Sequence, residues 1–414
     1  MTRDSNRAQR DGVQLVSLSD IEAAAERLKG RIIKTPLLTS TAIDEQLSKL
    51  ISPPEGPAID VRICFKAEHL QLTGAFKSRG AGNATQLSLA RLRAENPNFD
   101  PTKLCVLTHS SGNHAAALAL QAKLAGVQAA VVMPETAPQT KKDNTASHGA
   151  RIWFCKPTQQ AREDMAQEAQ KQLESEGLVV EFIHPYDDPA IIAGQGTMGR
   201  EMMMQTPYLQ ERGGCSHAAQ LNGSSSASDN EQLGGSSAWT RRGAASPPLD
   251  IVIAPVGGGG MLSGVATAVK GIDPRTIVVG AEPKAVDDAM RSFESGVRQP
   301  AVLPPDTICD GLLTSLSDLT LAHIERRVDL IATASETNVI LALKAVTSSM
   351  KQIIEPSAAV GLATLLEDNS QLRKVVRDVH ARKNEGEDQS VRIGIVWSGG
   401  NTTVQTIAEY LSKV

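Results

Sequence analysis

Short apolar runs alternate with amphipathic stretches along most of the chain. Eight runs rich in β-branched residues are apolar at successive positions, which is typical of strands buried on both faces of a parallel sheet. These runs are RICFK, KLCVLT, AAVVMP, RIWFCK, VVEFI, DIVIAPV, TIVVGAEP and RIGIVWS. Stretches with helical spacing, such as HAAALALQAKLAG, lie between them. This alternation predicts an α/β fold with mostly parallel sheets.

One segment, residues 213–248, interrupts the alternation. It contains six glycines and eight serines, and it ends in two prolines. A segment of this composition buries too little apolar surface to offset the entropy lost on ordering, so we expect a disordered surface insertion. The alternative is a regulatory or partner-binding insert, because long loops inside compact domains are often functional.

Length, charge and cysteine usage narrow the class of protein. A chain of 414 residues is long enough for two domains. A formal net charge of −4 argues against binding to nucleic acid or to an anionic membrane surface, and no apolar run is long enough to cross a bilayer. The N-terminus lacks the apolar core of a secretory signal, and five scattered cysteines without CxxC spacing indicate reduced thiols. We therefore expect a cytoplasmic protein.

The run TGAFKSRG contains a candidate nucleophile, Lys77. Because the run follows the predicted strand RICFK, we expect Lys77 near the N-terminus of the next helix. The positive end of the helix dipole disfavours an ammonium ion there, which lowers the pKa of the amine. A neutral amine can condense with an aldehyde. The alternative is an ordinary lysine on a helix surface.

Three further runs each follow a predicted strand. HSSGNH at 109–114 offers several N–H groups at a helix N-terminus, which suits a carboxylate, although Ser and Asn are also common helix caps. GGGG at 257–260, followed by Met261, allows close approach of a phosphate to backbone N–H groups, and the alternative is a flexible loop. SGGN at 398–401 ends the strand RIGIVWS.

In this order, the four runs resemble those of the fold-type II pyridoxal 5′-phosphate enzymes, in their serine/threonine dehydratase and serine racemase branch. The resemblance covers residues 20–410 apart from the insertion. It implies the α/β fold of the tryptophan synthase β subunit, with two three-layer domains whose sheets are mostly parallel. The small domain would comprise 100–185, and the large one would comprise 1–99 and 186–414, including the insertion. The cofactor would lie in the cleft between the domains, and the protein would be a homodimer.

The resemblance also implies a role for each matching residue. Lys77 would form the Schiff base and remove the Cα proton, and Ser111 would act as a second acid/base on the opposite face. The neutral hydroxyl of Ser398 would hydrogen-bond the pyridine nitrogen, an arrangement that suits β-elimination. The residues expected to bind the cofactor are Phe76, Lys77, Asn113, Gly257, Gly258, Gly259, Gly260, Met261, Gly311, Glu355 and Ser398. Those expected to bind the substrate are Ser110, Ser111, Gly112, Asn113 and His114.

A divalent-cation site is implied by the run AEPKAVDD. Glu282, the carbonyl of Val286, and Asp288 match the ligands of such a site in serine racemase-like members. Oxygen ligands suit Mg²⁺ or Ca²⁺. The alternative is an acidic turn that caps the following helix. Leu72 and His148 stand where nucleotide-binding members carry a lysine and a tyrosine, so we do not expect activation by ATP.

The activity implied by the resemblance is that of a serine racemase and L-serine ammonia-lyase acting on β-hydroxy amino acids. The products would be a keto acid and ammonia, together with interconversion of L- and D-serine. Threonine dehydratase and 3-hydroxyaspartate ammonia-lyase are alternatives with the same chemistry. A non-catalytic relative that binds pyridoxal phosphate is an alternative of another class, against which intact Lys77, Ser111 and Asn113 argue.

Overall fold

The computed structural model describes residues 12–110, 112–137, 139–211, 247–368, 370–383 and 388–414. Within these residues, strands form a six-stranded and a four-stranded sheet. The larger sheet has the order β1-β2-β10-β7-β8-β9, in which only β1 and β2 are antiparallel neighbours. Its strands are β1 (Leu37–Thr39), β2 (Val61–Ala67), β7 (Ile251–Pro255), β8 (Ile277–Pro283), β9 (Leu330–Ala334) and β10 (Val391–Trp397).

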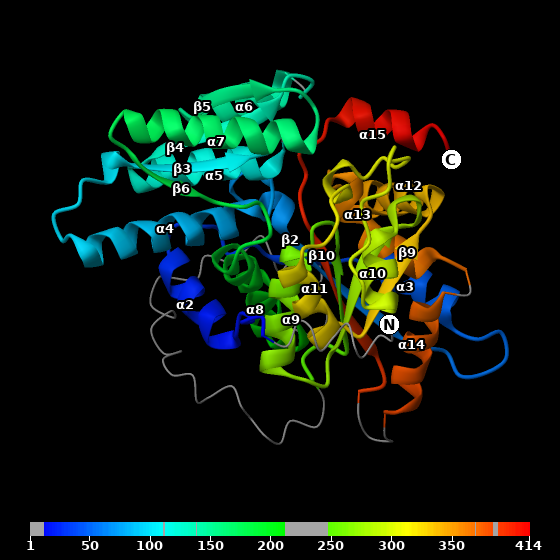
Figure 1. Ribbon diagram of the computed structural model, residues 1–414. Helices are drawn as coiled ribbons and strands as arrows, with labels where there is room; N and C mark the ends of the chain where they lie inside the picture. The colour runs from blue at the N-terminus through cyan, green and yellow to red at the C-terminus, as the bar shows by residue number, and fades with distance from the viewer. Residues whose placement is uncertain (1–11, 111, 138, 212–246, 369, 384–387) are drawn as a thin grey trace.

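The smaller sheet is parallel throughout, with the order β5-β4-β3-β6. Its strands are β3 (Leu104–His109), β4 (Gln128–Pro134), β5 (Arg151–Cys155) and β6 (Val179–Phe182). All of these strands fall within the predicted small domain, 100–185, although the limits of the two domains stay a prediction. In Figure 1, the smaller sheet and its helices lie at the upper left, and the larger sheet and its helices lie at the centre and right.

Helices connect the strands and cover the sheets. They are α2 (Leu18–Leu28), α3 (Thr41–Ile51), α4 (Lys77–Glu95), α5 (Asn113–Ala125), α6 (Gln139–Ser147), α7 (Gln159–Ser175), α8 (Pro189–Glu211), α9 (Gly260–Ile272), α10 (Asp288–Ser295), α11 (Asp318–Arg327), α12 (Glu336–Ala345), α13 (Pro356–Leu366), α14 (Gln371–Ala381) and α15 (Val404–Leu411). No helix in the described part of the chain is both long enough and apolar enough to cross a bilayer.

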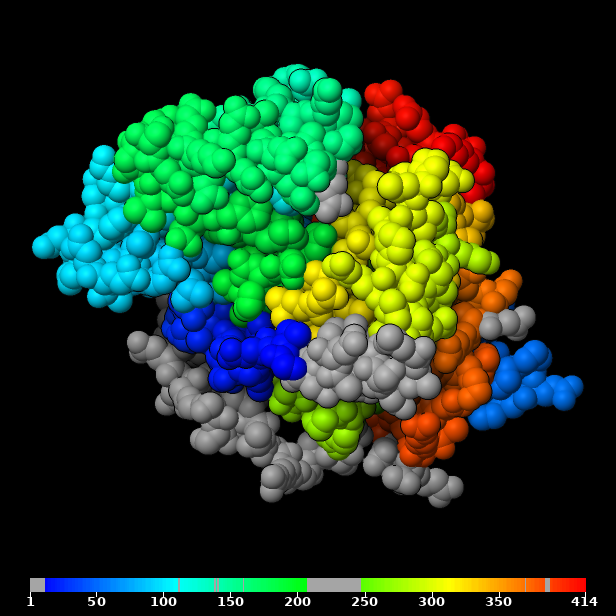
Figure 2. All heavy atoms as spheres, viewed as in Figure 1, coloured from blue at the N-terminus to red at the C-terminus, as the bar shows by residue number. Residues whose placement is uncertain are grey.

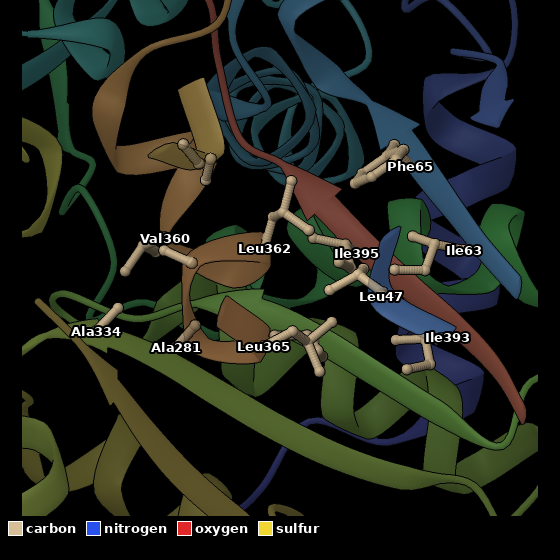
Figure 3. Close-up of a cluster of buried hydrophobic side chains, with 14 of the residues drawn as sticks. Leu47, Ile63, Phe65, Ala281, Ala334, Val360, Leu362, Leu365, Ile393 and Ile395 are labelled. Atoms are coloured by element: carbon tan, nitrogen blue, oxygen red, sulfur yellow. The ribbon is translucent and has the colours of Figure 1, made fainter. Parts of the chain in front are cut away.

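The larger sheet is covered on both faces, as its strand pattern predicts. On one face, Phe65, Ile393 and Ile395 pack against Val360 and Leu362 of α13 (Figure 3). The other face packs against α8 and α9 through a separate cluster of buried side chains, which includes Met198, Met202, Val252, Leu262 and Val265. Burial on both faces explains why these strands read as continuous apolar runs.

The prediction of full burial is wrong for two strands of the smaller sheet. β5 and β6 leave several side chains partly exposed, including Phe154 at 45% and Phe182 at 39%. Both strands lie at the edges of the sheet, and an edge position cannot be read from the apolar pattern of a single strand. The predicted insertion, 213–248, lies outside the described residues except for its last two positions.

Candidate active site

Two of the four runs meet through their backbones. β2 and β10 are parallel neighbours, so the runs that follow them, TGAFK and SGGN, leave the same edge of the larger sheet. There, Ala75 forms an antiparallel bridge with Gly399. The Phe76 N–H donates to the carbonyl oxygen of Ser398 at 3.0 Å. The position of Lys77 is therefore tied directly to the SGGN turn.

Lys77 is the first residue of α4, and its side chain is partly buried. Its Nζ donates to the carbonyl oxygen of Pro185 at 2.9 Å and lies 5.0 Å from the centre of the Phe76 ring. Burial lowers the pKa of Lys77 from 10.5 to about 8. The direction agrees with the sequence-based expectation, and the cause is removal of the amine from water on burial.

Asn113 joins the smaller sheet to the larger one. It begins α5, and its Nδ2 donates to both carboxylate oxygens of Glu355, at 3.1 and 3.2 Å. Its Oδ1 accepts from Asn401 of the SGGN run at 2.8 Å. The Glu355 N–H in turn donates to Gly399 at 3.0 Å, and burial raises the pKa of Glu355 to about 7. Two of the four runs, HSSGNH and SGGN, thus meet at the Asn113 amide, beside Glu355.

The remaining residues of HSSGNH form the turn between β3 and α5. Gly112 precedes the helix, and its N–H donates to Oγ of Ser110 at 3.3 Å. His114 is buried in the first turn of α5, and burial holds its pKa well below the usual range, so the imidazole is neutral at pH 7. Ser111, the predicted second acid/base, lies outside the described residues.

The glycine run, Gly257–Gly260, connects β7 to α9, as the strand–helix pattern predicts. A Cβ on Gly258 would come within 2.5 Å of the Tyr186 ring, and one on Gly259, whose φ is +85°, would lie 2.6 Å from Leu316. Any side chain here would therefore clash with the protein. The N–H groups at the start of α9 are not used within the helix, which leaves them available to an anion.

Three other predicted cofactor contacts lie around this loop or at the end of β10. Met261 is buried in the first turn of α9, and Ser398 is buried at the end of β10. The carbonyl oxygen of Gly311 would lie 3.4 Å from a Cβ on Gly257, so Gly311 borders the glycine loop. Its N–H donates to Oγ of Ser357 at 3.0 Å.

The turn after β6 was not predicted from the sequence. Pro185 accepts the Lys77 hydrogen bond, and Tyr186 packs on the glycine loop. Nδ1 of His184 accepts from the Asp187 N–H at 2.9 Å, and its ring lies 5.5 Å from that of His109. Burial lowers the pKa of His184 to about 4. The signal that could have revealed this turn is its place, His-Pro-Tyr-Asp-Asp-Pro directly after a strand of the smaller sheet.

One of the predicted cation ligands, Glu282, caps the following helix, which is the alternative to a cation site. The Glu282 carboxylate accepts the N–H groups of Ala289 and Met290, both at 2.9 Å, and so caps α10. Asp288 lies in the same turn and is buried, and its Oδ2 has no hydrogen-bond partner within the described residues. Val286 is also buried, in the short turn between β8 and α10.

Both carboxyl groups hold protons more tightly than usual. Burial raises the pKa of Glu282 to about 8 and that of Asp288 to about 6. No cluster of three or more His, Cys, Asp or Glu side chains suited to a metal occurs in the part of the chain that the structure describes. Two buried acids with one unpaired oxygen nevertheless fit a cation whose other ligands are carbonyl oxygens or water. The cation site stays a prediction.

Comparison with known proteins tests the resemblance. The sequence profile of the family described as "Pyridoxal-phosphate dependent enzyme" matches residues 29–377. The chain belongs to this family. The predicted family is thereby confirmed, and so is the assignment of the chain as an enzyme of the pyridoxal-phosphate-dependent racemase and ammonia-lyase class.

Three relatives illustrate the range of the family. A β-hydroxyaspartate dehydratase of Paracoccus denitrificans is 35% identical over 390 residues, which cover 94% of this chain and 97% of the relative. The crystal structure of serine racemase from Dictyostelium discoideum is 34% identical, with a TM-score of 0.70 and coverage of 94% and 99%. The crystal structure of a T.th. threonine deaminase is 34% identical, with a TM-score of 0.69 and the same coverage. These matches confirm the fold-type II architecture.

Proposed function

We propose that this enzyme acts on β-hydroxy amino acids, with L-serine as the leading substrate, and that it couples dehydration to interconversion of the enantiomers. Loss of water from serine gives aminoacrylate, which takes up water again and releases ammonia and pyruvate. The observation that carries the proposal is the Lys77 amine, whose pKa is lowered to about 8 and which lies where the runs TGAFK and SGGN meet.

The residues around Lys77 fit pyridoxal phosphate. When bound, the cofactor supplies an aldehyde that an amine can attack and a ring that withdraws electrons from the substrate Cα. Gly257–Gly260 offers N–H groups for its phosphate, in a loop that excludes side chains. Asn113 and Glu355 would flank the ring hydroxyl, and Ser398 would face the ring nitrogen.

Proton transfer at the substrate Cα is proposed for Lys77 on one face and Ser111 on the other. A general base works best when its pKa is close to the operating pH, and the pKa of Lys77, at about 8, meets this condition. The predicted substrate-binding turn before α5 would hold the substrate carboxylate at the N-terminus of that helix. The turn His184–Asp187 would close the site beside Lys77.

Threonine and 3-hydroxyaspartate are the alternative substrates. The relatives named above are a β-hydroxyaspartate dehydratase, a serine racemase and a threonine deaminase, at nearly equal identity. Their names therefore support the shared chemistry and do not favour one side chain over another. We further propose Mg²⁺ or Ca²⁺ at Glu282 and Asp288, a homodimer, a cytoplasmic location, and a small domain of residues 100–185.

A substrate panel tests the proposal. The enzyme loaded with pyridoxal phosphate is incubated with each isomer of serine, threonine and 3-hydroxyaspartate, and keto acid and inverted amino acid are measured. We expect pyruvate and D-serine from L-serine. Turnover of 3-hydroxyaspartate or threonine with no reaction of serine would replace the leading substrate, and no turnover of any isomer would contradict the proposal.

A serine-to-alanine substitution separates the proposed roles of Lys77 and Ser111 on the two faces of the substrate Cα. In Ser111→Ala, we expect interconversion of L- and D-serine to stop, because the acid opposite Lys77 is lost. Dehydration of L-serine, which begins with proton removal by Lys77, should survive in part. The measurement is keto acid formation from each enantiomer alongside chiral analysis of the remaining serine. A variant that handles D-serine as well as the parent does would show that Ser111 is not the second base.

A further inference from the structure

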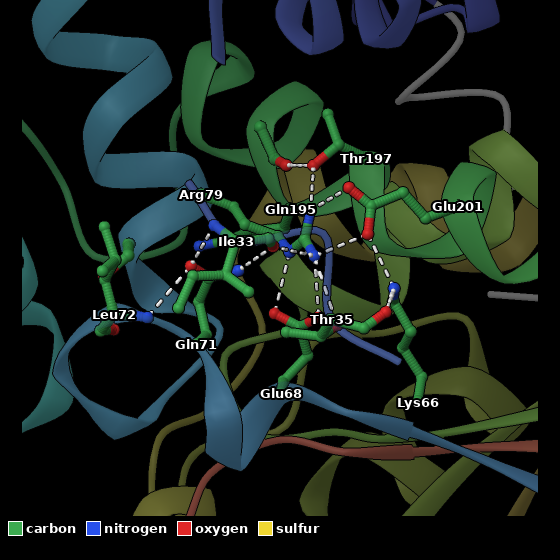
Figure 4. Close-up of polar contacts among 12 residues, drawn as sticks. Ile33, Thr35, Lys66, Glu68, Gln71, Leu72, Arg79, Gln195, Thr197 and Glu201 are labelled. Atoms are coloured by element: carbon green, nitrogen blue, oxygen red, sulfur yellow. Dashed lines mark hydrogen bonds and ion pairs between the residues drawn. The ribbon is translucent and has the colours of Figure 1, made fainter. Parts of the chain in front are cut away.

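Four charged side chains are buried together beneath the active-site edge of the larger sheet (Figure 4). The side chains of Lys66, Glu68 and Arg79 are fully buried, and that of Glu201 is 15% exposed. Two cations and two carboxylates make the cluster neutral. The members come from β2, from the turn after it, from α4 and from α8, so the cluster joins segments far apart in the sequence.

Arg79 is the centre of this cluster. Its guanidinium donates to both carboxylate oxygens of Glu68, each at 2.8 Å, and to both of Glu201, each at 2.8 Å. It also donates to Oγ1 of Thr197 at 3.1 Å. Only a guanidinium can form two bidentate pairs at once, and a lysine cannot reproduce this geometry. Because desolvation offsets much of the Coulombic attraction of a buried pair, the value of such a cluster lies in geometric specificity more than in stability.

The cluster also lies at a close contact between α4 and α8. A Cβ on Gly194 would come within 2.7 Å of the Arg79 carbonyl oxygen and of the Gly80 Cα. The Gly80 N–H donates to Oε1 of Gln195 at 3.2 Å. The first turn of α4 is therefore pressed against α8 by small residues and held there by the guanidinium.

Lys77 lies at the start of the same helical turn. Two residues along a helix correspond to a rotation of about 200°, so the Lys77 and Arg79 side chains leave α4 on nearly opposite sides. The Lys77 amine donates to Pro185, in the turn that leads into α8. One partner of this hydrogen bond thus belongs to α4, and the other to the turn that leads into α8, the helix to which Arg79 is bonded.

We propose that Arg79 is a positioning residue, which sets the location of the Lys77 amine by clamping the first turn of α4 against α8. The clamp holds α4 through the Arg79 backbone and α8 through Glu201 and Thr197, while Glu68 fixes the guanidinium to the end of β2. The inference rests on the proposed role of Lys77 as the lysine that binds the cofactor.

The test compares two arginine-to-lysine substitutions. Arg79→Lys keeps the charge and breaks the bidentate geometry. Arg373→Lys is the matched control, because Arg373 is also buried but lies on α14, where it donates to the carbonyl oxygens of Leu365 and Leu366. Each protein is loaded with pyridoxal phosphate over a range of pH, reduced with borohydride, digested and mapped for the pyridoxyl label. Unfolding temperature and kcat for L-serine are measured in parallel.

In Arg79→Lys, we expect the pH midpoint of Lys77 labelling to move upward by about one unit, because a displaced amine is better hydrated. We expect kcat to fall about 10- to 100-fold, as misplacement of a reacting group predicts. Arg373→Lys should lower the unfolding temperature and leave the midpoint and kcat unchanged. A folded Arg79→Lys protein with the parent midpoint and kcat would overturn the proposal, and so would an equal shift in the control.

Two further outcomes are distinguishable. If Arg79→Lys does not fold, Glu201→Gln weakens the α8 side of the clamp, together with the Glu201–Lys66 ion pair, and a shift in the same direction but smaller is expected. No shift would overturn the proposal. If the label in the parent protein maps to a lysine other than Lys77, the proposed role of Lys77 fails, whatever Arg79 does.

Discussion

Two regions of this molecule bury ionisable side chains, and they compensate them differently. In the cluster around Arg79, every charge faces an opposite charge, and the arginine and lysine keep the pKa of Glu201 below its usual value despite burial. At the candidate active site, Lys77 faces a carbonyl oxygen and Glu355 an amide, and their pKa values move to about 8 and about 7. In the view of Figure 2, the elements of the smaller sheet, coloured cyan to green, lie beside the yellow part of the chain, which includes α11.

These two kinds of compensation suit different roles, one in fixing the structure and one in moving protons. A charge matched by a counter-charge is held in one protonation state across the physiological range and can fix geometry. A buried group matched only by a dipole titrates close to pH 7 and can move a proton. The acids Glu282 and Asp288 belong to the second kind, since their pKa values are raised to about 8 and about 6.

Removing the Lys77 amine, which faces no counter-charge, should have the largest effect on activity and a small effect on stability. In Lys77→Ala, we expect turnover to be abolished, because only an amine can bind the cofactor aldehyde and take the Cα proton. The free energy of unfolding should stay within about 1 kcal/mol of the parent, since no ion pair is broken. Keto acid assays and urea unfolding check the two expectations. Substantial remaining turnover would show that Lys77 is not the essential amine.

Removing Arg79, which is paired with two carboxylates, should instead have a large effect on the free energy of unfolding. In Arg79→Met, Glu68 and Glu201 keep only Lys66 as a counter-charge, so we expect a loss of about 3–5 kcal/mol in the free energy of unfolding. Urea denaturation measures it, and Lys77→Ala serves as the comparison. A loss below about 1 kcal/mol would mean that the two regions do not differ in the way described.

The acids Glu282 and Asp288 should make stability depend on pH and on a divalent cation. Because the pKa of Glu282 rises from 4.5 to about 8 on folding, the folded state holds the proton that the unfolded state has lost. Stability without a cation should therefore fall as the pH rises from 4.5 to 8. Bound Mg²⁺ should restore about 1–3 kcal/mol, more at pH 8 than at pH 5.

Thermal unfolding with chelator and with Mg²⁺ at both pH values provides this measurement. Asp288→Asn is the variant that should lose the response to the cation while keeping the cap that Glu282 forms on α10. An equal response in parent and variant would place the cation elsewhere.

The sequence predicts the candidate active site better than it predicts the cluster around Arg79. TGAFK, GGGG and SGGN each follow a strand of the larger sheet, and the carboxyl ends of its parallel strands meet at one edge, so their approach follows from pattern. HSSGNH follows β3 of the smaller sheet, so its approach to the other runs does not follow from this rule. The turn His184–Asp187 was not predicted because it carries no glycine-rich or hydroxyl-rich run. Arg79 and Glu201 are separated by 122 positions, and no local pattern announces that such a pair will meet. For the same reason the edge positions of β5 and β6 were missed.

The most direct test of the account is to find which lysine carries the cofactor. The enzyme is loaded with pyridoxal phosphate, reduced with borohydride, digested and analysed by mass spectrometry, over a range of pH. We expect one pyridoxyl label, on Lys77, with a labelling midpoint close to the lowered pKa of about 8. A label on any other lysine, such as the ion-paired Lys66, or a midpoint at the ordinary lysine value of 10.5, would contradict it.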